Sequence, residues 1–153
     1  MSGVRVGDLA PDFTLPDQLG DLVRLGDLVG KKNVVLYFYP KDATPGCTAE
    51  ARAFRDAYDT FTAADTEVVG VSSDSVKSHR RFAAKHQLPF RLLSDPDGAV
   101  RALYGVERTL GILPGRVTYV IDRQCVVQHV YSSQFAARKH VREARQAVRC
   151  MDR

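Results

Sequence analysis

The feature that most constrains this chain is a buried-strand pattern that ends abruptly just before a single cysteine. Residues 34–39 form a continuous apolar run, which is typical of a central strand covered on both faces. The run stops at Pro40, and Pro45 and Gly46 then place Cys47 in the predicted first turn of a helix. Unpaired backbone N–H groups and the positive end of the helix dipole favour a thiolate there. The sequence therefore predicts a reactive cysteine at a strand-to-helix junction.

The other apolar patterns alternate between strand and helix. We expect strands over 22–25, 33–39, 67–72 and 90–93, and a final hairpin of strands 116–122 and 125–131. Helices are expected after Cys47, from an N-cap at Asp74 or Ser73 to about Gln87, over 99–104, and from near Phe135. In the first helix Ala51, Phe54, Tyr58 and Phe61 recur at helical spacing. This order predicts an α/β fold with a central mixed β-sheet flanked by helices, in one domain over 1–153.

The stretch around the cysteine also resembles a known family. The spacing Pro40-x-x-x-Thr44-x-x-Cys47 resembles the active-site signature of the peroxiredoxins, and residues 38–50 resemble their Q-type, or bacterioferritin-comigratory-protein, subfamily. The resemblance implies a thioredoxin-like fold. It also implies a thiol-dependent peroxidase that reduces hydrogen peroxide and organic hydroperoxides through a cysteine sulfenic acid.

Two further stretches support this resemblance in the same order along the chain. Residues 7–15 resemble the opening segment of the family. Residues 114–122 resemble the segment that carries its active-site arginine, which here is Arg116. The similarity extends over nearly the whole chain, and because the three stretches occur in the family's order, a chance resemblance is a poor explanation.

The resemblance assigns four site residues, and each role makes chemical sense. Cys47 is the nucleophile, Thr44 offers its hydroxyl, and Arg116 holds the thiolate and the polarised peroxide together. Pro40 shapes the loop and shields the sulfur, while the backbone N–H groups of Gly46 and Cys47 add donors. Such donors matter because full ionisation of a free thiol at pH 7 gains only about thirty-fold. A fast peroxidase therefore needs groups aimed at the breaking O–O bond.

The remaining polar residues suggest no metal centre. Glu50 matches the subfamily pattern, and it either braces an arginine or lies exposed in the first helical turn. Four histidines show no metal-ligand clustering with the cysteines, so we expect them to be structural or solvated: His79, His86, His129 and His140. We expect neither a metal nor another cofactor.

The chain departs from the subfamily at the position of the resolving cysteine. Many Q-type members carry that cysteine five residues after the reactive one, where this chain has Arg52, and the helix over 77–87 contains none. Strand and helix lengths place Cys125 and Cys150 each about 20 Å from Cys47, whereas a disulfide needs Cα atoms within about 7 Å. We therefore expect a one-cysteine cycle that uses an outside thiol: thioredoxin, glutaredoxin or a low-molecular-weight thiol.

Two competing functions are weaker. A thioredoxin-like disulfide reductase needs C-x-x-C, but the residue three positions after Cys47 is Glu50. A redox-sensing or chaperone-like binding protein of the thioredoxin fold is the alternative that stays open. The presence of both Thr44 and Arg116 favours catalytic turnover over sensing.

Composition and charge limit the kinds of partner and the cellular location that we expect for this chain. The chain has 153 residues and a net charge of +4, and its late arginines alternate with apolar residues at helical spacing. This pattern is typical of the solvated face of an amphipathic helix, so we expect no binding to nucleic acid.

The sequence also bears on location. The first residues lack the apolar core of a signal peptide, and no apolar run is long enough for a membrane span. Three cysteines argue against a secreted disulfide framework. We expect a cytoplasmic monomer or weak homodimer.

Overall fold

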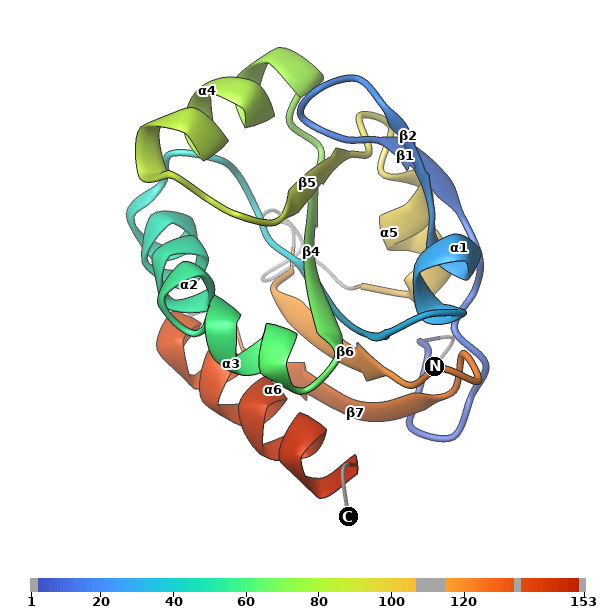
Figure 1. Cartoon of the computed structure of the whole chain (residues 1–153). Helices are drawn as coiled ribbons and strands as arrows, with labels where there is room; N and C mark the ends of the chain where they lie inside the picture. Colours follow the sequence, from blue (N-terminus) through green and yellow to red (C-terminus); the bar gives the residue numbers. More distant parts are fainter. Residues whose placement is uncertain (1–2, 107–114, 134–135, 152–153) are drawn as a thin grey trace.

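A five-stranded mixed sheet forms the centre of the protein in the computed structural model, which describes residues 3–106, 115–133 and 136–151. The strands lie in the order β5-β4-β3-β6-β7. Their bounds are β3 Asn33–Phe38, β4 Thr66–Ser72, β5 Arg91–Ser94, β6 Val117–Ile121 and β7 Val127–Ser132. The β3, β4 and β5 strands are parallel, whereas β6 runs antiparallel to β3 and to β7. The predicted mixed sheet is confirmed (Figure 1).

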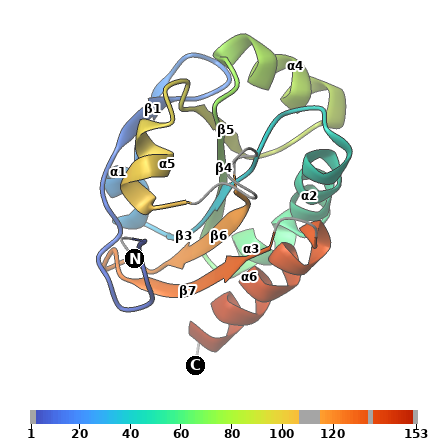
Figure 2. The same ribbon diagram turned by 180° about the vertical axis from the view of Figure 1, so that it is seen from behind.

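Helices cover both faces of this sheet. On one face lie α2 (Pro45–Asp56), α3 (Tyr58–Ala63) and the long α6 (Ala137–Met151), as Figure 1 shows. On the other face lie α1 (Leu25–Val29), α5 (Ala99–Tyr104) and a ribbon of β1 (Thr14–Pro16) and β2 (Leu22–Arg24), as the reverse view shows (Figure 2). The α4 helix (Val76–His86) packs beside the β5 edge. None of the helices described is long and apolar enough to cross a membrane.

The central strand explains why both faces need a cover. All six residues of β3 are buried. Val34, Leu36 and Phe38 belong to the core under α1 and α5. Val35 and Tyr37 belong to the second core, under α2 and α6, and this second core also contains Cys47. Since side chains alternate along a strand, one apolar run supplies two cores at once.

The structure differs from the predicted elements in four places. The long helix expected after Cys47 is two helices, because the backbone leaves helical geometry at Ala57, although alanine gives no sequence signal for a break. Ser75, rather than Asp74 or Ser73, caps α4, and its hydroxyl accepts the N–H of Ser78 at 3.1 Å. The short β1 and α1 were not expected. Their segments are too brief to show a clear period.

The late elements agree with the sequence. The β6–β7 hairpin turns across Arg123 and Gln124 as expected, and Cys125 follows with a φ of 65°. Phe135, where the last helix was expected to begin, lies outside the described residues. The α6 helix is amphipathic as predicted, since it buries Val141, Ala144 and Val148 and exposes its arginines.

Candidate active site

The loop between β3 and α2 carries Cys47 to the edge of the core. Thr44 has extended backbone angles at the N-cap, Pro45 occupies the first helical position, and Cys47 is the third residue of α2. Proline suits this position because it lacks the N–H that a helix start leaves unpaired. The Cys47 side chain faces inward and is only 1% exposed. The sequence prediction of a cysteine in the first turn of a helix is confirmed.

Two donors contact the sulfur. The Arg116 Nη2 atom lies 3.3 Å from Cys47 Sγ, and the backbone N–H of Lys41 donates to the same sulfur at 3.5 Å. Among the described residues, Lys41 thus provides a backbone donor to the sulfur that the sequence analysis did not name. The expected donation from the Gly46 and Cys47 N–H groups concerns the oxygens of a peroxide and stays a prediction. A cation and an N–H directed at one sulfur stabilise its thiolate form.

Sheet register brings Arg116 to this position. Val117 pairs with Phe38 across β6 and β3, so the residue before β6 lies beside the chain that leaves β3. Gly46 leaves space for the guanidinium, because a Cβ at that position would lie 3.1 Å from Arg116 Nη2. Burial alone would lower the pKa of Arg116, but the neighbouring Glu50 and Cys47 outweigh it and raise the pKa. Arg116 is thus a permanent cation beside the sulfur.

Glu50 forms the far side of the same cluster. It is completely buried and accepts a hydrogen bond from Arg116 Nη1, so of the two expectations, bracing an arginine is correct and exposure is wrong. Its Oε2 atom has no hydrogen-bond partner within the described residues. Burial raises the pKa of Glu50 to about 8, and Arg116 only partly offsets this. The carboxyl therefore lies close to its protonation midpoint near neutral pH.

His140 closes this cluster from α6. Its Nε2–H donates to the Ser133 carbonyl at 2.7 Å, and its Nδ1 accepts the Thr118 hydroxyl at 2.7 Å. Its Nδ1 lies 3.8 Å from Glu50 Oε2. Burial lowers the pKa of His140 to about 4, and the nearby Arg116 contributes. A neutral ring therefore stands beside Glu50.

Thr44 and Pro40 line the loop without a described contact to the sulfur. Thr44 is the N-cap residue of α2, but its hydroxyl donates to the Lys41 carbonyl at 2.9 Å and forms no side-chain cap hydrogen bond. The hydroxyl must therefore turn from Lys41 before it can donate to a peroxide. Pro40 is half-buried and directly precedes Lys41, the backbone donor to the sulfur. The catalytic roles of Thr44 and Pro40 therefore remain predictions.

Arg101 joins the two segments that carry the site, and no pattern in the sequence indicated this role. This buried arginine of α5 donates to the Tyr39 carbonyl at 2.9 Å and to the Gly115 carbonyl at 2.8 Å. One carbonyl precedes Pro40 and the other precedes Arg116. The guanidinium therefore fixes the distance between the loop of the cysteine and the start of β6.

A second buried polar cluster holds the other side of the loop. Asp42 accepts hydrogen bonds from the Tyr39 hydroxyl at 2.6 Å and the Ser78 hydroxyl at 2.8 Å, and it lies 2.7 Å from His79 Nδ1. His79 Nε2 lies 3.0 Å from the Leu93 carbonyl. Both ring nitrogens of His79 therefore lie within hydrogen-bond distance of an oxygen acceptor. The sequence had indicated only a structural or solvated histidine.

The same cluster is the only group of metal-ligand type among the described residues. One ligand atom each of Asp42, Asp74 and His79 lies within 4.8 Å of the others. Hydrogen bonds already use these atoms, because Asp74 Oδ2 accepts the Asp42 N–H at 2.8 Å and the Ser72 hydroxyl at 2.6 Å. The arrangement is that of a polar network that orders a loop.

The other two cysteines are far from this site. All three cysteines are free thiols. Cys125 follows the β6–β7 turn, at the sheet end opposite the start of β6, and Cys150 is exposed in the last turn of α6. Arg52, at the position where many Q-type proteins carry a resolving cysteine, is exposed on α2.

Comparison with known proteins identifies the class. The AhpC/TSA family profile matches residues 6–130. The fold, the buried cysteine and its arginine agree with this match, and the chain belongs to the AhpC/TSA family of peroxiredoxins.

Its relatives narrow the subfamily. The chain is 52% identical over 141 residues to chloroplastic peroxiredoxin Q of Triticum aestivum, covering 92% of this chain and 64% of that protein. It is 54% identical to chloroplastic peroxiredoxin Q of Sedum lineare, covering 92% of this chain and 75% of the relative. The chain thus spans about two thirds of the length of some of these relatives. The expected resemblance to Q-type peroxiredoxins is confirmed.

Solved structures of related proteins have the same fold as this chain. Peroxidoxin BcpB from Mycobacterium tuberculosis is 41% identical with a TM-score of 0.90, covering 97% of this chain and 98% of that one. A mutant of PrxQ from Xylella fastidiosa is 30% identical with a TM-score of 0.90, and the match covers all of both chains. The predicted thioredoxin-like fold is confirmed. The sensor or chaperone alternative is not favoured by these relatives, and the chloroplastic names of the plant proteins argue against the cytoplasmic expectation.

Proposed function

We propose that this protein is a thiol-dependent peroxidase that reduces hydrogen peroxide and organic hydroperoxides, with Cys47 as its nucleophile. The observation that carries the proposal is the 3.3 Å contact between Arg116 Nη2 and the buried Cys47 Sγ. A structural thiol in an apolar core needs no cation beside it. A thiolate that must attack a peroxide needs one, because charge develops on the oxygens as the O–O bond breaks.

The reaction follows from these contacts. The Cys47 thiolate attacks one peroxide oxygen, and an S–O bond forms as the O–O bond breaks. The second oxygen leaves with the bonding electron pair and takes a proton, giving water or an alcohol. The sulfur is oxidised by two electrons to a sulfenic acid, and the peroxide is reduced by two.

Three groups assist this step in the proposal. Arg116 holds the thiolate and the attacked oxygen within one planar fork, and Glu50 orients that fork through Nη1. The Thr44 hydroxyl turns from the Lys41 carbonyl to donate to the peroxide. Pro40 has no N–H and keeps the loop rigid, so that the Lys41 N–H stays directed at the sulfur.

An outside thiol completes the cycle in this proposal. It attacks the sulfenic sulfur, forms a mixed disulfide and releases water, and a second thiol then frees Cys47. Resolution by Cys125 is disfavoured because Arg116 and Asp122 lie at opposite ends of β6, six residue steps apart. At about 3.3 Å per step this distance is about 20 Å, and Cys125 lies beyond it. Thioredoxin, glutaredoxin and a low-molecular-weight thiol are the candidate reductants.

We also propose that residues 1–153 act as one domain and as a monomer or weak homodimer. The two donors to the sulfur among the described residues, Arg116 and the Lys41 N–H, belong to the chain that carries Cys47, which supports a site formed by a single copy. Sedimentation equilibrium across a range of protein concentrations tests the oligomeric state.

Intact-mass measurement after one equivalent of peroxide tests the cycle. A gain of one oxygen on Cys47 is expected. An internal disulfide or a linked dimer would contradict the one-cysteine cycle, and an unchanged mass would contradict the peroxidase. Sustained peroxide consumption with excess dithiothreitol separates an enzyme from a sensor, since a sensor would stop after one equivalent per chain.

A further inference from the structure

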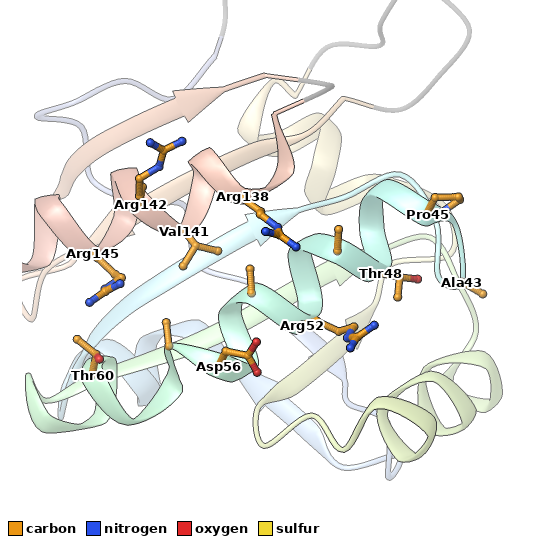
Figure 3. Close-up of a pocket in the computed structure, with 13 residues that line it drawn as sticks. Ala43, Pro45, Thr48, Arg52, Asp56, Thr60, Arg138, Val141, Arg142 and Arg145 are labelled. Atoms are coloured by element: carbon orange, nitrogen blue, oxygen red, sulfur yellow. The ribbon is translucent and has the colours of Figure 1, made fainter.

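A groove of about 780 Å³ runs between α2, α3 and α6, beside the candidate active site (Figure 3). Ala49 and Ala53 of α2 and Ala57 at its C-cap recur every four residues, and their small side chains line the groove. Val141 lines the groove from α6. The small side chains leave a channel between the helices that has an apolar floor.

Four arginines form the rim of this groove. Arg138, Arg142 and Arg145 come from α6, and Arg52 comes from α2 on the opposite wall (Figure 3). All four are exposed, and within the described part of the chain none pairs with a carboxylate. Asp56 is the single acidic residue among the described lining residues. The groove therefore presents an excess of positive charge that the chain itself leaves uncompensated.

A solvated helix face explains only part of this arrangement. Spacing by one turn accounts for the three arginines of α6. It does not account for the fourth arginine, Arg52, which lines the same groove from a different helix, nor for the apolar channel between the two walls. Together these features define a binding groove for a negatively charged partner.

One end of the groove lies at the reactive cysteine. Ala43, Pro45 and Thr48 line it, and they belong to the loop and first helical turn that carry Cys47. Cys47 is only 1% exposed, so a second thiol reaches its sulfur only when this turn opens. A partner bound along α2 would therefore stand where the opening takes place.

We propose that this groove docks the acidic face of a protein thiol reductant, which then reduces the oxidised Cys47. The inference rests on the proposed one-cysteine peroxidase cycle and identifies its reductant by charge. The partner's thiolate attacks the sulfenic sulfur, an S–S bond forms, and the oxygen leaves as water after protonation. The partner's second thiol attacks this mixed disulfide, releases the Cys47 thiolate and leaves the partner oxidised by two electrons.

The dimensions favour a protein over a small thiol or a nucleic acid. Arg138 and Arg145 are seven residues apart, about 10 Å along α6, and Arg52 adds a charge across the channel. A tripeptide thiol cannot engage all of these charges at once. No aromatic side chain lines the groove among the described residues, so stacking platforms for bases are missing there.

The test neutralises the end of the groove remote from Cys47. The double variant Arg142→Gln/Arg145→Gln is compared with Lys77→Gln/Arg81→Gln, which removes two exposed cations from α4, outside the groove. The probes are a thioredoxin of net negative charge, glutathione as a small anionic thiol, and neutral dithiothreitol. Reduction of pre-oxidised Cys47 is followed at ionic strengths of about 10 mM and 0.5 M, which screen exposed charges very differently.

The groove variant should reduce the second-order rate constant with thioredoxin by about 3- to 10-fold at low ionic strength, because rim charges mainly set association rates. The loss should shrink at high salt, and it should grow in Arg142→Glu/Arg145→Glu. The control variant, and all rates with dithiothreitol, should match the parent. Unchanged thioredoxin rates in both groove variants would overturn the proposal.

Two other outcomes would assign the groove differently and also overturn the proposal. Equal losses with glutathione and thioredoxin would indicate a small anionic thiol as the occupant. Salt-sensitive binding of a short single-stranded oligonucleotide, lost in the groove variant while thioredoxin rates stay unchanged, would indicate nucleic acid. Stopped-flow oxidation of Cys47 by hydrogen peroxide reports the proposed peroxidase step independently, because no reductant takes part in it.

Discussion

Two buried polar clusters lie on either side of the Cys47 loop, and they differ in what they touch. Arg116 and Glu50 contact each other, and the arginine reaches the sulfur. Asp42 and His79 form an equally buried pair, but it reaches only the backbone and neighbouring side chains. One cluster is therefore placed to change the reactivity of the thiol. The other is placed to hold the loop that presents it.

The two clusters also differ in how completely their atoms are satisfied. Two buried side-chain oxygens lack a hydrogen-bond partner within the described residues, Glu50 Oε2 and the Tyr37 hydroxyl, and both lie on the Cys47 side of the sheet. Asp42, in contrast, accepts from Tyr39 and Ser78 as well as meeting His79. Satisfied networks rigidify a fold, while unsatisfied ones mark sites where function has a cost in stability.

The contrast between the two clusters assumes that all peroxide reactivity resides at Cys47. Cys47→Ser should reduce peroxide consumption to the uncatalysed background, because a serine hydroxyl at neutral pH has almost no anionic form. Steady-state consumption with dithiothreitol measures this. The melting temperature should remain near that of the parent, since serine is similar in size and the Asp42 cluster is untouched. Residual turnover by the folded variant would place the chemistry elsewhere.

The role of the first cluster is tested most sharply by Arg116→Lys. Lysine keeps the charge but loses the planar fork that meets both Cys47 and Glu50. We expect Cys47 oxidation to slow by about 10²- to 10³-fold, the usual loss for one oriented donor. Ionisation alone accounts for at most about thirty-fold near pH 7. Stopped-flow rates at a pH where both thiols are ionised isolate the difference. Equal rates there would reduce Arg116 to a charge that only favours the thiolate.

The second cluster should affect stability more than chemistry. His79→Asn removes the imidazole beside the buried Asp42, which keeps only the hydroxyls of Tyr39 and Ser78 as side-chain donors. The free energy of unfolding should therefore fall by about 3–5 kcal/mol. Urea unfolding measures the loss, and Asp42→Asn with the double variant completes a cycle that isolates the coupling between the two residues. The folded His79→Asn protein should oxidise Cys47 much faster than Arg116→Lys. A smaller stability loss together with a larger kinetic loss would reverse the contrast between the clusters.

Local patterns account for the part of this site that the sequence predicted. The apolar run of β3, the proline and glycine before Cys47, and the arginine that opens β6 are each features of neighbouring residues. The β6–β3 pairing then brings Arg116 to the sulfur without further information. Their contact follows once a mixed sheet is assumed, although the roles of Thr44 and Pro40 in catalysis stay predictions.

Long-range contacts account for the part that was missed. Asp42 and His79 are 37 residues apart, and a loop and a helix share no period that could pair them. Arg101 binds two backbone carbonyls, Tyr39 and Gly115, which leave no trace in a side-chain pattern. The burial of Glu50 depends on the α6 helix closing over α2, which a first-turn carboxylate does not reveal.

The pH dependence of the free energy of unfolding isolates the contribution of the buried Glu50 carboxyl. Its pKa is about 8 in the folded protein against an ordinary 4.5, so between these values the folded state binds more protons than the unfolded state. The contribution of Glu50 to the free energy of unfolding is therefore fully present below pH 4.5 and is lost as the pH rises towards 8. Relative to Glu50→Gln, the parent should lose up to about 1.4 kcal/mol per pH unit in this window. Urea unfolding of both proteins at pH 5, 6, 7 and 8 measures the slope, and parallel curves would contradict it.

The smallest effect is expected at the two distal cysteines. Cys125 lies after the β6–β7 turn, with its thiol 3.5 Å from the Ala10 carbonyl, and Cys150 is exposed on α6. At Cys125 a serine hydroxyl can still donate a hydrogen bond, and at Cys150 an exposed serine is well solvated. Cys125→Ser and Cys150→Ser should therefore change turnover by less than about twofold. Steady-state rates with one fixed reductant measure this. A large loss in either variant, with Cys47 oxidation still fast, would mean that the chain resolves its own sulfenic acid across the length of the sheet. The fold would then have to open far beyond the first turn of α2 in every cycle, and the Asp42 cluster could not hold the loop as rigidly as its hydrogen bonds indicate.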